Sequence, residues 1–204
     1  MKNLSTVFIL FFLIALTSSF TAGPGYQVGD TVKDFSLKGT NGKNVSLSDF
    51  KNDKGVILVF DCNTCPVSKM YNARIMELSK KYKSQGFPLV AVNANDPGMS
   101  PGDSFEEMVA VSKKKGYDFP YLFDETQQVA KAFGATNTPH VFVLKREGSE
   151  FKVAYIGAID NNSKDANSAS KKYVEDAVEA LLGGKPIPTE KTKAIGCGIK
   201  YRNA

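Results

Sequence analysis

Two cysteines one helical turn apart are the residues of this chain best suited to chemistry. Cys62 and Cys65 stand in the run Cys62-Asn63-Thr64-Cys65-Pro66, directly after the apolar residues 56–60. The apolar run predicts a strand buried on both faces, and the pattern after Pro66 predicts a helix. A helix N-terminus offers free backbone N–H groups and the positive end of its dipole. Both stabilise a thiolate, the reactive form of cysteine.

Three kinds of chemistry fit this pair. As a catalytic dithiol, Cys62 is predicted to be the more exposed thiol and the closer one to the helix end; it would attack a disulfide, and Cys65 would resolve the mixed disulfide. As metal ligands, the two cysteines supply only two of the four ligands that structural zinc usually has, and no second C-x-x-C follows. As a structural disulfide it would close a very short loop and stabilise the fold weakly. Redox chemistry is the favoured interpretation.

Thr138-Pro139-His140 is the second feature. Only about one X–Pro bond in twenty is cis in folded proteins, so on its residues alone Pro139 is predicted to be an ordinary trans proline that begins a strand. His140 is the single histidine of the chain. Such a residue is more often a surface or core residue than a ligand.

A third cysteine, Cys197, lies between Gly196 and Gly198 near the C-terminus. It is either a second resolving thiol folded back over Cys62, or a free or intermolecular cysteine in a loose tail. An odd cysteine in an exported protein fits either role, and the sequence leaves the two open.

The first 22 residues have the layout of a secretory signal peptide: Lys2, an apolar stretch over residues 7–16, and small residues over 17–22. The apolar stretch is shorter than the ~20 residues that span a bilayer. The sequence therefore predicts an exported protein, periplasmic or extracellular, without a stable membrane anchor after cleavage. Disulfides persist there, so a reductive role requires an extracytoplasmic electron donor.

Removal of residues 1–22 leaves 182 of the 204 residues, enough for one domain with a sizeable core. The net charge falls from +5 to +4, because that segment holds one charged residue, Lys2. The positive charges are spread along the chain and form no basic stripe with interleaved aromatics, so nucleic-acid binding is not predicted.

The remaining pattern predicts an α/β fold. Domain 23–184 is expected to form one unit, with 185–204 as a tail that carries Cys197. Asn41-Gly42 predicts a hairpin turn, and residues 160–170 a polar loop. The predicted strands are 32–37, 45–47, 56–60, 89–93, 121–123, 141–144 and 151–156, and the predicted helices are 67–82, 104–115, 124–134 and 173–182.

Four segments resemble the thioredoxin-like superfamily, in its AhpC/TSA-type redoxin branch. They are residues 28–37, the run 62–66, residues 119–124 and residues 134–139, and the resemblance covers about residues 26–182. It implies a thioredoxin-like fold, with a central mixed β-sheet flanked by helices and an N-terminal β-hairpin extension. It also implies no cofactor, and protein thiols or disulfides as partners.

The resemblance further implies site roles. Cys62 corresponds to the family's nucleophile and Cys65 to its resolving thiol. Pro139 corresponds to a cis-proline that packs beside the dithiol, so the resemblance reverses the trans peptide bond expected from the local sequence alone. Thr138 corresponds to a residue that presents its backbone to a bound partner.

The chain departs from thioredoxin around the dithiol. Asp61 replaces the usual tryptophan before the first cysteine, and its charge should oppose a Cys62 thiolate. Asn63-Thr64 replaces Gly-Pro, and Val56 stands where thioredoxins carry a buried acid.

The leading hypothesis is an exported thiol–disulfide oxidoreductase. One alternative is a thiol peroxidase that uses Cys62 or Cys65 with Cys197 as the resolving thiol. The peroxiredoxin pattern P-x-x-x-[T/S]-x-x-C disfavours it, since Val59 and Gly55 occupy the Thr/Ser and Pro positions before Cys62.

A further alternative is a copper-binding protein that resembles the Sco-like redoxins. Those bind copper through two cysteines before a proline and a distant histidine, which Cys62, Cys65 and His140 superficially echo. That family, however, spaces its cysteines C-x-x-x-C and carries its histidine in a separate loop.

Overall fold

The computed structural model describes residues 25–202, so the predicted signal peptide lies outside the described residues. Eight strands form one mixed sheet in the order β1-β9-β8-β4-β5-β6-β2-β3, and β10 and β7 form a small second sheet. The strands are β1 Thr31–Val32, β2 Ser36–Gly39, β3 Asn44–Ser46, β4 Gly55–Phe60, β5 Leu89–Asn93, β6 Tyr121–Phe123, β7 Asn137–Thr138, β8 His140–Glu147, β9 Glu150–Gly157 and β10 Cys197–Gly198.

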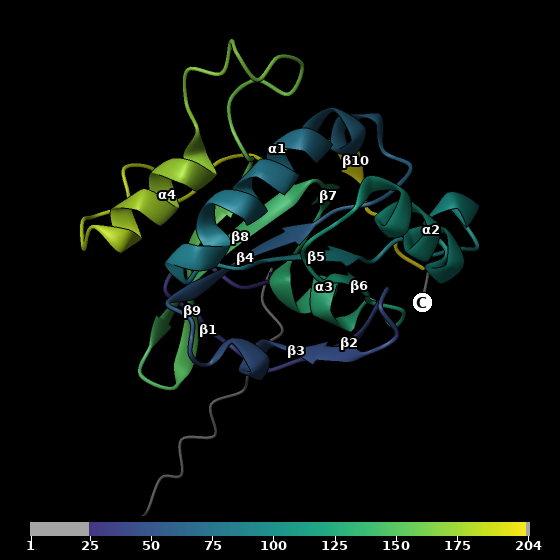
Figure 1. Ribbon diagram of the computed structural model, residues 1–204, viewed down its shortest axis with the longest axis horizontal. Helices are drawn as coiled ribbons and strands as arrows, with labels where there is room; N and C mark the ends of the chain where they lie inside the picture. The colour runs from purple at the N-terminus through teal and green to yellow at the C-terminus, as the bar shows by residue number, and fades with distance from the viewer. Residues whose placement is uncertain (1–24, 203–204) are drawn as a thin grey trace, which may run out of the picture.

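The helices cover the two faces of the large sheet (Figure 1). Residues of α1, α2 and α4 pack with one apolar layer, and residues of α3 pack with the other. The α-helices are α1 Pro66–Tyr82, α2 Phe105–Lys115, α3 Gln128–Phe133 and α4 Tyr173–Leu182, and the 3₁₀ turns are η1 Leu47–Phe50, η2 Lys83–Gln85 and η3 Pro101–Asp103. The predicted α/β architecture with helices on a central mixed sheet is confirmed.

Strand β4 lies at the centre of the sheet and is buried along its whole length. It runs parallel to β5 and antiparallel to β8. Successive side chains point to opposite faces, so Ile57 and Val59 enter one apolar layer and Leu58 and Phe60 the other. Each such side chain contributes roughly 1.5–3 kcal/mol by leaving water. The end of β4, where the dithiol begins, is therefore held rigidly.

The predicted single strand over residues 32–37 is wrong. The segment forms two strands at different places in the sheet: β1 pairs with β9, and β2 pairs with β6 and with β3. Between them the Asp34 carboxylate accepts hydrogen bonds from the N–H groups of Phe35 (2.9 Å) and Ser48 (3.0 Å), which redirects the chain. The predicted hairpin is confirmed as β2–β3.

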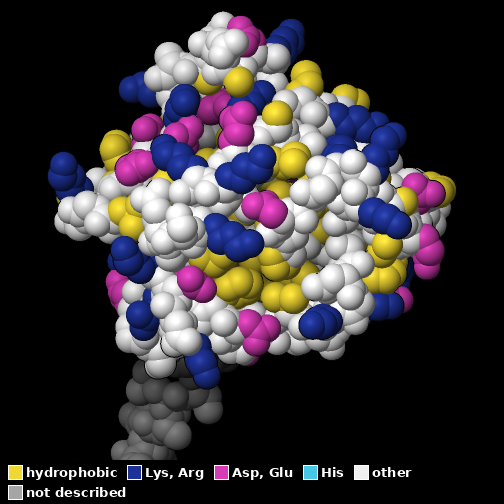
Figure 2. All heavy atoms as spheres, in the orientation of Figure 1, with side chains coloured by type: hydrophobic (Ala, Val, Ile, Leu, Met, Phe, Trp, Pro, Cys, Tyr) yellow, Lys and Arg dark blue, Asp and Glu magenta, His cyan; other side chains and the backbone are white. Residues whose placement is uncertain are grey.

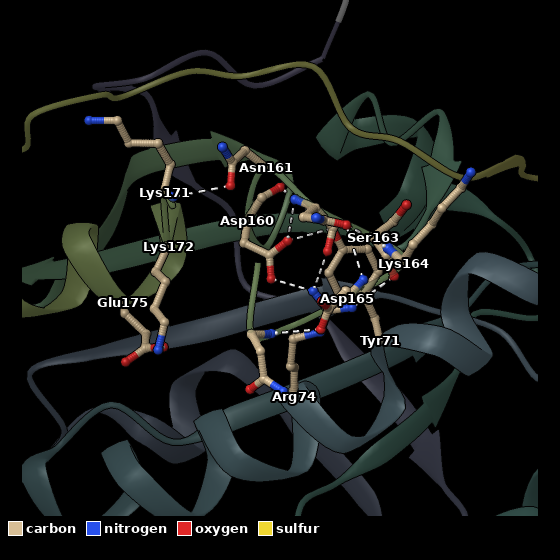
Figure 3. Close-up of polar contacts among 12 residues, drawn as sticks. Tyr71, Arg74, Asp160, Asn161, Ser163, Lys164, Asp165, Lys171, Lys172 and Glu175 are labelled. Atoms are coloured by element: carbon tan, nitrogen blue, oxygen red, sulfur yellow. Dashed lines mark hydrogen bonds and ion pairs between the residues drawn. The ribbon is translucent and has the colours of Figure 1, made fainter. Parts of the chain in front are cut away.

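The polar loop 160–171 projects beside α4 and is tied to α1 (Figures 1 and 3). Arg74 of α1 forms an ion pair with Asp160 and donates to the carbonyl oxygens of Asn162 (2.6 Å) and Ser163 (2.8 Å). The Tyr71 hydroxyl donates to the Asp160 carboxylate at 2.9 Å. Asp160 is therefore a buried anchor for a loop in which the sequence showed no chemistry.

Positive and negative side chains are interspersed on the face in Figure 2. On this face, the mixed pattern agrees with the sequence analysis, which found no basic stripe. Within residues 25–202, none of the helices has the length and apolar character needed to cross a membrane.

Candidate functional site

The dithiol lies where β4 passes into α1. Cys65 is the N-cap residue of α1, and Pro66 occupies the first turn as predicted. One detail of the prediction is wrong: Cys65, not Cys62, stands at the helix end. Cys62 is the more exposed thiol of the two, as predicted, although both are buried. Cys62 is 5% exposed and Cys65 2%, because other parts of the chain cover both. The Cys65 N–H donates to Cys62 Sγ at 3.4 Å.

The Thr138–Pro139 loop packs directly against both thiols. The peptide bond between these residues is cis, so the expectation implied by the resemblance is confirmed and the one from the residues alone is wrong. The Thr138 hydroxyl lies 3.1 Å from Cys62 Sγ, and the Cys65 thiol donates to the Thr138 carbonyl oxygen at 3.2 Å. Thr138 thus contacts each thiol with a different atom.

Asp103 fixes the loop between the cysteines, and sequence reasoning missed it. Its buried carboxylate accepts the Asn63 N–H (2.6 Å) and the Thr64 hydroxyl (2.7 Å). It also accepts hydrogen bonds from Ser100 (2.6 Å) and Asn95 (2.8 Å). Burial acts to raise the pKa of Asp103, but these hydrogen bonds outweigh it and lower the pKa. The ionised Asp103 therefore clamps the C-x-x-C loop.

Two more polar residues complete this support. The Tyr121 hydroxyl donates to Asn63 Oδ1 at 3.0 Å, and the Asn93 amide donates to both Asp103 and Tyr121 at 3.1 Å. Asn93 and Tyr121 belong to the parallel neighbours β5 and β6. The signal in the sequence was a polar residue at the end of an apolar strand pattern, next to a loop rich in Asp, Pro and Gly.

The C-terminal segment brings the third thiol to the site. Cys197 lies opposite Thr138 in the β10–β7 ladder, and its N–H donates to Cys65 Sγ at 3.3 Å. The sequence left two alternatives for Cys197: a thiol folded back over Cys62, or a cysteine in a loose tail. The structure places Cys197 in a packed segment next to the dithiol, where it contacts Cys65. Figure 1 shows β10 close to β7 and the start of α1.

The three thiols have different acidities. Burial raises the pKa of Cys62, and the negative charges of Asp103 and Asp61 add to the rise, against the hydrogen bond from Thr138. Burial also acts to raise the pKa of Cys65, but hydrogen bonds from the Cys197 thiol and from the N–H groups of Ser68 and Cys197 outweigh it and lower the pKa. The hydrogen bond to Cys65 raises the pKa of Cys197 to about 11. Cys65 is therefore the thiol best suited to be a thiolate.

Asp61 is a buried acid beside the dithiol. Val56, at the position where thioredoxins carry their acid, is a fully buried apolar residue of the core. The buried acid of this chain is instead Asp61, whose exposed fraction is 5%. Its Oδ1 has no hydrogen-bond partner among the described residues. Burial raises the pKa of Asp61 to about 6, and its charge opposes the Cys62 thiolate as expected.

His140 is a core residue. It is buried, its Nδ1 accepts the Thr136 N–H at 3.3 Å, and its ring packs on Phe142. Burial, assisted by the charge of Lys191, lowers the pKa of His140 to about 4. In the described part of the chain, no three His, Cys, Asp or Glu side chains gather in a way that could hold a metal ion. The placement of His140 therefore gives the copper hypothesis no support.

Comparisons with known proteins agree with this geometry. The AhpC/TSA family model matches residues 28–154. The thiol-disulfide oxidoreductase ResA of Bacillus subtilis is 34% identical over 134 residues, covering 66% of this chain and 70% of that protein.

Two solved structures are similar. An uncharacterized conserved protein of Geobacillus kaustophilus has a TM-score of 0.81 and 35% identity, covering 88% of this chain and 94% of its own. A Chlorobium tepidum protein assigned as a thiol:disulfide interchange protein DsbE has a TM-score of 0.57 and 26% identity, covering 78% of this chain and 100% of its own. The chain therefore belongs to the AhpC/TSA family and has a thioredoxin-like fold.

Proposed function

We propose that this protein is an exported thiol–disulfide oxidoreductase whose Cys62–Cys65 pair exchanges electrons with protein thiols or disulfides. The observation that carries the proposal is the placement of both thiols at the start of α1, against Thr138 of the cis-Pro139 loop. The related thiol-disulfide oxidoreductase from Bacillus subtilis supports the same class of reaction.

Each neighbour of the pair has a role in this chemistry. The lowered pKa of Cys65 makes it a good leaving group when a disulfide to it is broken. The Thr138 hydroxyl orients Cys62 Sγ, and Asp103 holds the intervening loop. Asp61, with a pKa of about 6 and an unpartnered oxygen, is the buried group that can hold a proton while Cys62 changes between thiol and disulfide.

The direct test is reduction of a model peptide disulfide by the chain without residues 1–22, with a small-molecule dithiol supplied as the electron donor. Cys62→Ser and Cys65→Ser are each expected to abolish turnover, because neither variant can form the Cys62–Cys65 disulfide. Ser79→Ala, a buried substitution within α1 away from the thiols, serves as the control and should retain activity. Unchanged turnover in Cys62→Ser would refute the assignment.

The peroxidase alternative is tested in the same preparation. Gly55 and Val59 lie inside β4 with no side-chain donor for a peroxide. We therefore expect hydrogen peroxide to be consumed no faster than by an ordinary free thiol. Rapid consumption that is lost on cysteine substitution would restore the alternative.

Export is tested separately, because it depends on residues 1–22 alone. Those residues, fused to a reporter that is active only outside the cytoplasm, are expected to give reporter activity, and deletion of residues 7–16 should abolish it. The partner is then an extracytoplasmic thiol or disulfide protein, with an electron donor in the same compartment. A fusion that stays inactive would remove the proposed location but not the proposed reaction.

A further inference from the structure

The C-terminal strand covers the dithiol and is held in place on both sides of Cys197. The Ile199 N–H donates to Thr136 O (3.0 Å), and the Asn137 amide donates to Gly196 O (3.0 Å). Further along, Lys200 exchanges backbone hydrogen bonds with the Asn95 side chain (2.8 Å) and the Asp96 N–H (2.9 Å). Before the strand, the Thr192 hydroxyl accepts the Ala158 N–H at 2.9 Å. This segment is therefore a fixed part of the fold.

The fit at the strand itself is close. A Cβ on Gly196 would lie 2.0 Å from the Thr138 carbonyl oxygen, so only glycine lets the backbone pass there. Beyond it, Cys197 is partly exposed, whereas Cys62 and Cys65 are 5% and 2% exposed. A protein-sized partner thus meets Cys197 before it can meet either thiol of the pair.

We propose that Cys197 is a third redox residue, the relay through which a partner protein exchanges electrons with the buried Cys62–Cys65 pair. The proposal rests on the proposed function and specifies which cysteine of the chain first reacts with a partner protein. Contact between Cys197 and Cys65 carries it: the Cys197 N–H donates to Cys65 Sγ at 3.3 Å, and Cys197 lies opposite Thr138, whose carbonyl oxygen accepts the Cys65 thiol.

The relay is a sequence of balanced thiol–disulfide exchanges. In the oxidised chain, the Cys197 thiolate attacks Cys65 Sγ; the Cys65–Cys197 bond forms, the Cys62–Cys65 bond breaks, and Cys62 leaves as a thiolate that takes up the proton lost by Cys197. A partner thiolate then attacks Cys197 Sγ and Cys65 leaves as a thiolate. A second partner thiolate attacks the partner's own sulfur and releases Cys197. The partner dithiol is oxidised, the pair is reduced, and the reverse sequence reduces a partner disulfide.

The acidities of the thiols suit these steps. Cys65 is the leaving group when a partner attacks Cys197, and the N–H groups of Ser68 and Cys197 remain to stabilise its thiolate. The hydrogen bond to Cys65 is the main cause of the raised pKa of Cys197. This cause disappears once Cys65 is held in a disulfide, which is the state in which Cys197 must attack.

The first test is trapping. Cys65→Ser retains Cys62 and Cys197, and it is incubated with a peptide whose cysteine is activated as a mixed disulfide. Mass spectrometry of the digested adduct is expected to find the peptide on Cys197. A peptide found on Cys62 would overturn the relay, because Cys62 would then meet partners directly.

The second test is turnover of a model peptide disulfide by Cys197→Ser. The expected rate is lower by about tenfold or more, while mass mapping still finds the Cys62–Cys65 disulfide after oxidation. Ile195→Ser, an exposed position in the same segment, is the control and should match the wild type. An equal or faster rate in Cys197→Ser would overturn the relay and leave the segment as a cover. Inactivity of the wild type would instead refute the proposed function.

Discussion

At the scale of single residues, buried polar groups determine how the dithiol is presented. Asp103 accepts hydrogen bonds from the C-x-x-C loop, and Thr138 contacts both thiols. Asp61 and Asp103 both disfavour the Cys62 thiolate through their charges. The geometry therefore keeps Cys62 as a thiol and Cys65 as the more acidic partner.

Asp103→Asn should destabilise the protein by about 3 kcal/mol, because an amide nitrogen would replace an oxygen that accepts hydrogen bonds from several donors at once. Chemical denaturation at neutral pH measures this loss. The lowered pKa means that the wild-type stabilisation is present above the unfolded-state pKa of about 4 and is lost as the pH falls further. Asp118→Asn, at an exposed carboxyl, is the control, and an equal loss in both variants would contradict the clamp.

At the scale of elements, the short strand β10 controls access to the thiols. Gly196→Ala should break the β10–β7 pairing, since the new Cβ would overlap the Thr138 carbonyl oxygen at 2.0 Å. We expect a thiol reagent to modify Cys65 about tenfold faster or more, because reactivity follows exposure of the thiolate.

Gly198→Ala is the matched control for that experiment. A Cβ there meets only Thr136 O, at 3.9 Å, which is ordinary contact. It should leave the labelling rate near that of the wild type. If the two variants label Cys65 at the same rate, the β10 strand does not protect the site.

The Arg74–Asp160 pair attaches the loop 160–171 to α1 (Figure 3). Arg74→Met should cost about 3 kcal/mol, since it leaves the buried Asp160 carboxylate without its cation, and hydrogen exchange in the loop should become faster. Lys81→Met removes solvent-accessible ion pairs with Glu175 and Glu179 and should cost less than about 1 kcal/mol. Similar losses in the two variants would show that burial does not distinguish the pairs.

At the scale of the whole molecule, two buried groups titrate in opposite senses. Asp61 holds its proton to a pKa of about 6 in the fold, above its unfolded value, so its contribution lowers stability as the pH rises from about 4 to about 6. His140 loses its proton at a pKa of about 4 in the fold, below its unfolded value, so its contribution raises stability from about pH 4 to about pH 6.5. Each contribution is about 3 kcal/mol, and the two largely cancel.

Two variants should separate these contributions. Between pH 4 and pH 6.5, the unfolding free energy of Asp61→Asn should rise by about 3 kcal/mol relative to the wild type, and that of His140→Gln should fall by about 3 kcal/mol. Denaturant titrations at several pH values measure both differences. Parallel curves for wild type and variants would mean that these groups titrate alike in the folded and unfolded chain.

Much of the fold followed from local pattern. The apolar run 56–60, the periodicity after Pro66 and the hairpin at Asn41-Gly42 each predicted the observed element. The predicted strand 32–37 failed because alternation does not say which strand a segment pairs with; Asp34 turns the chain, and β1 and β2 join different strands.

By itself, the sequence determined the redox motif, the α/β class and the family resemblance, because these depend on residue types at short spacing. Only the tertiary structure decided which thiol caps the helix, which acids surround the pair and where Cys197 lies. Those features depend on contacts between residues far apart in the chain, such as Asn63 with Asp103 and Cys65 with Cys197. Burial and hydrogen bonding at these contacts set the acidity of each thiol, and no local pattern encodes them.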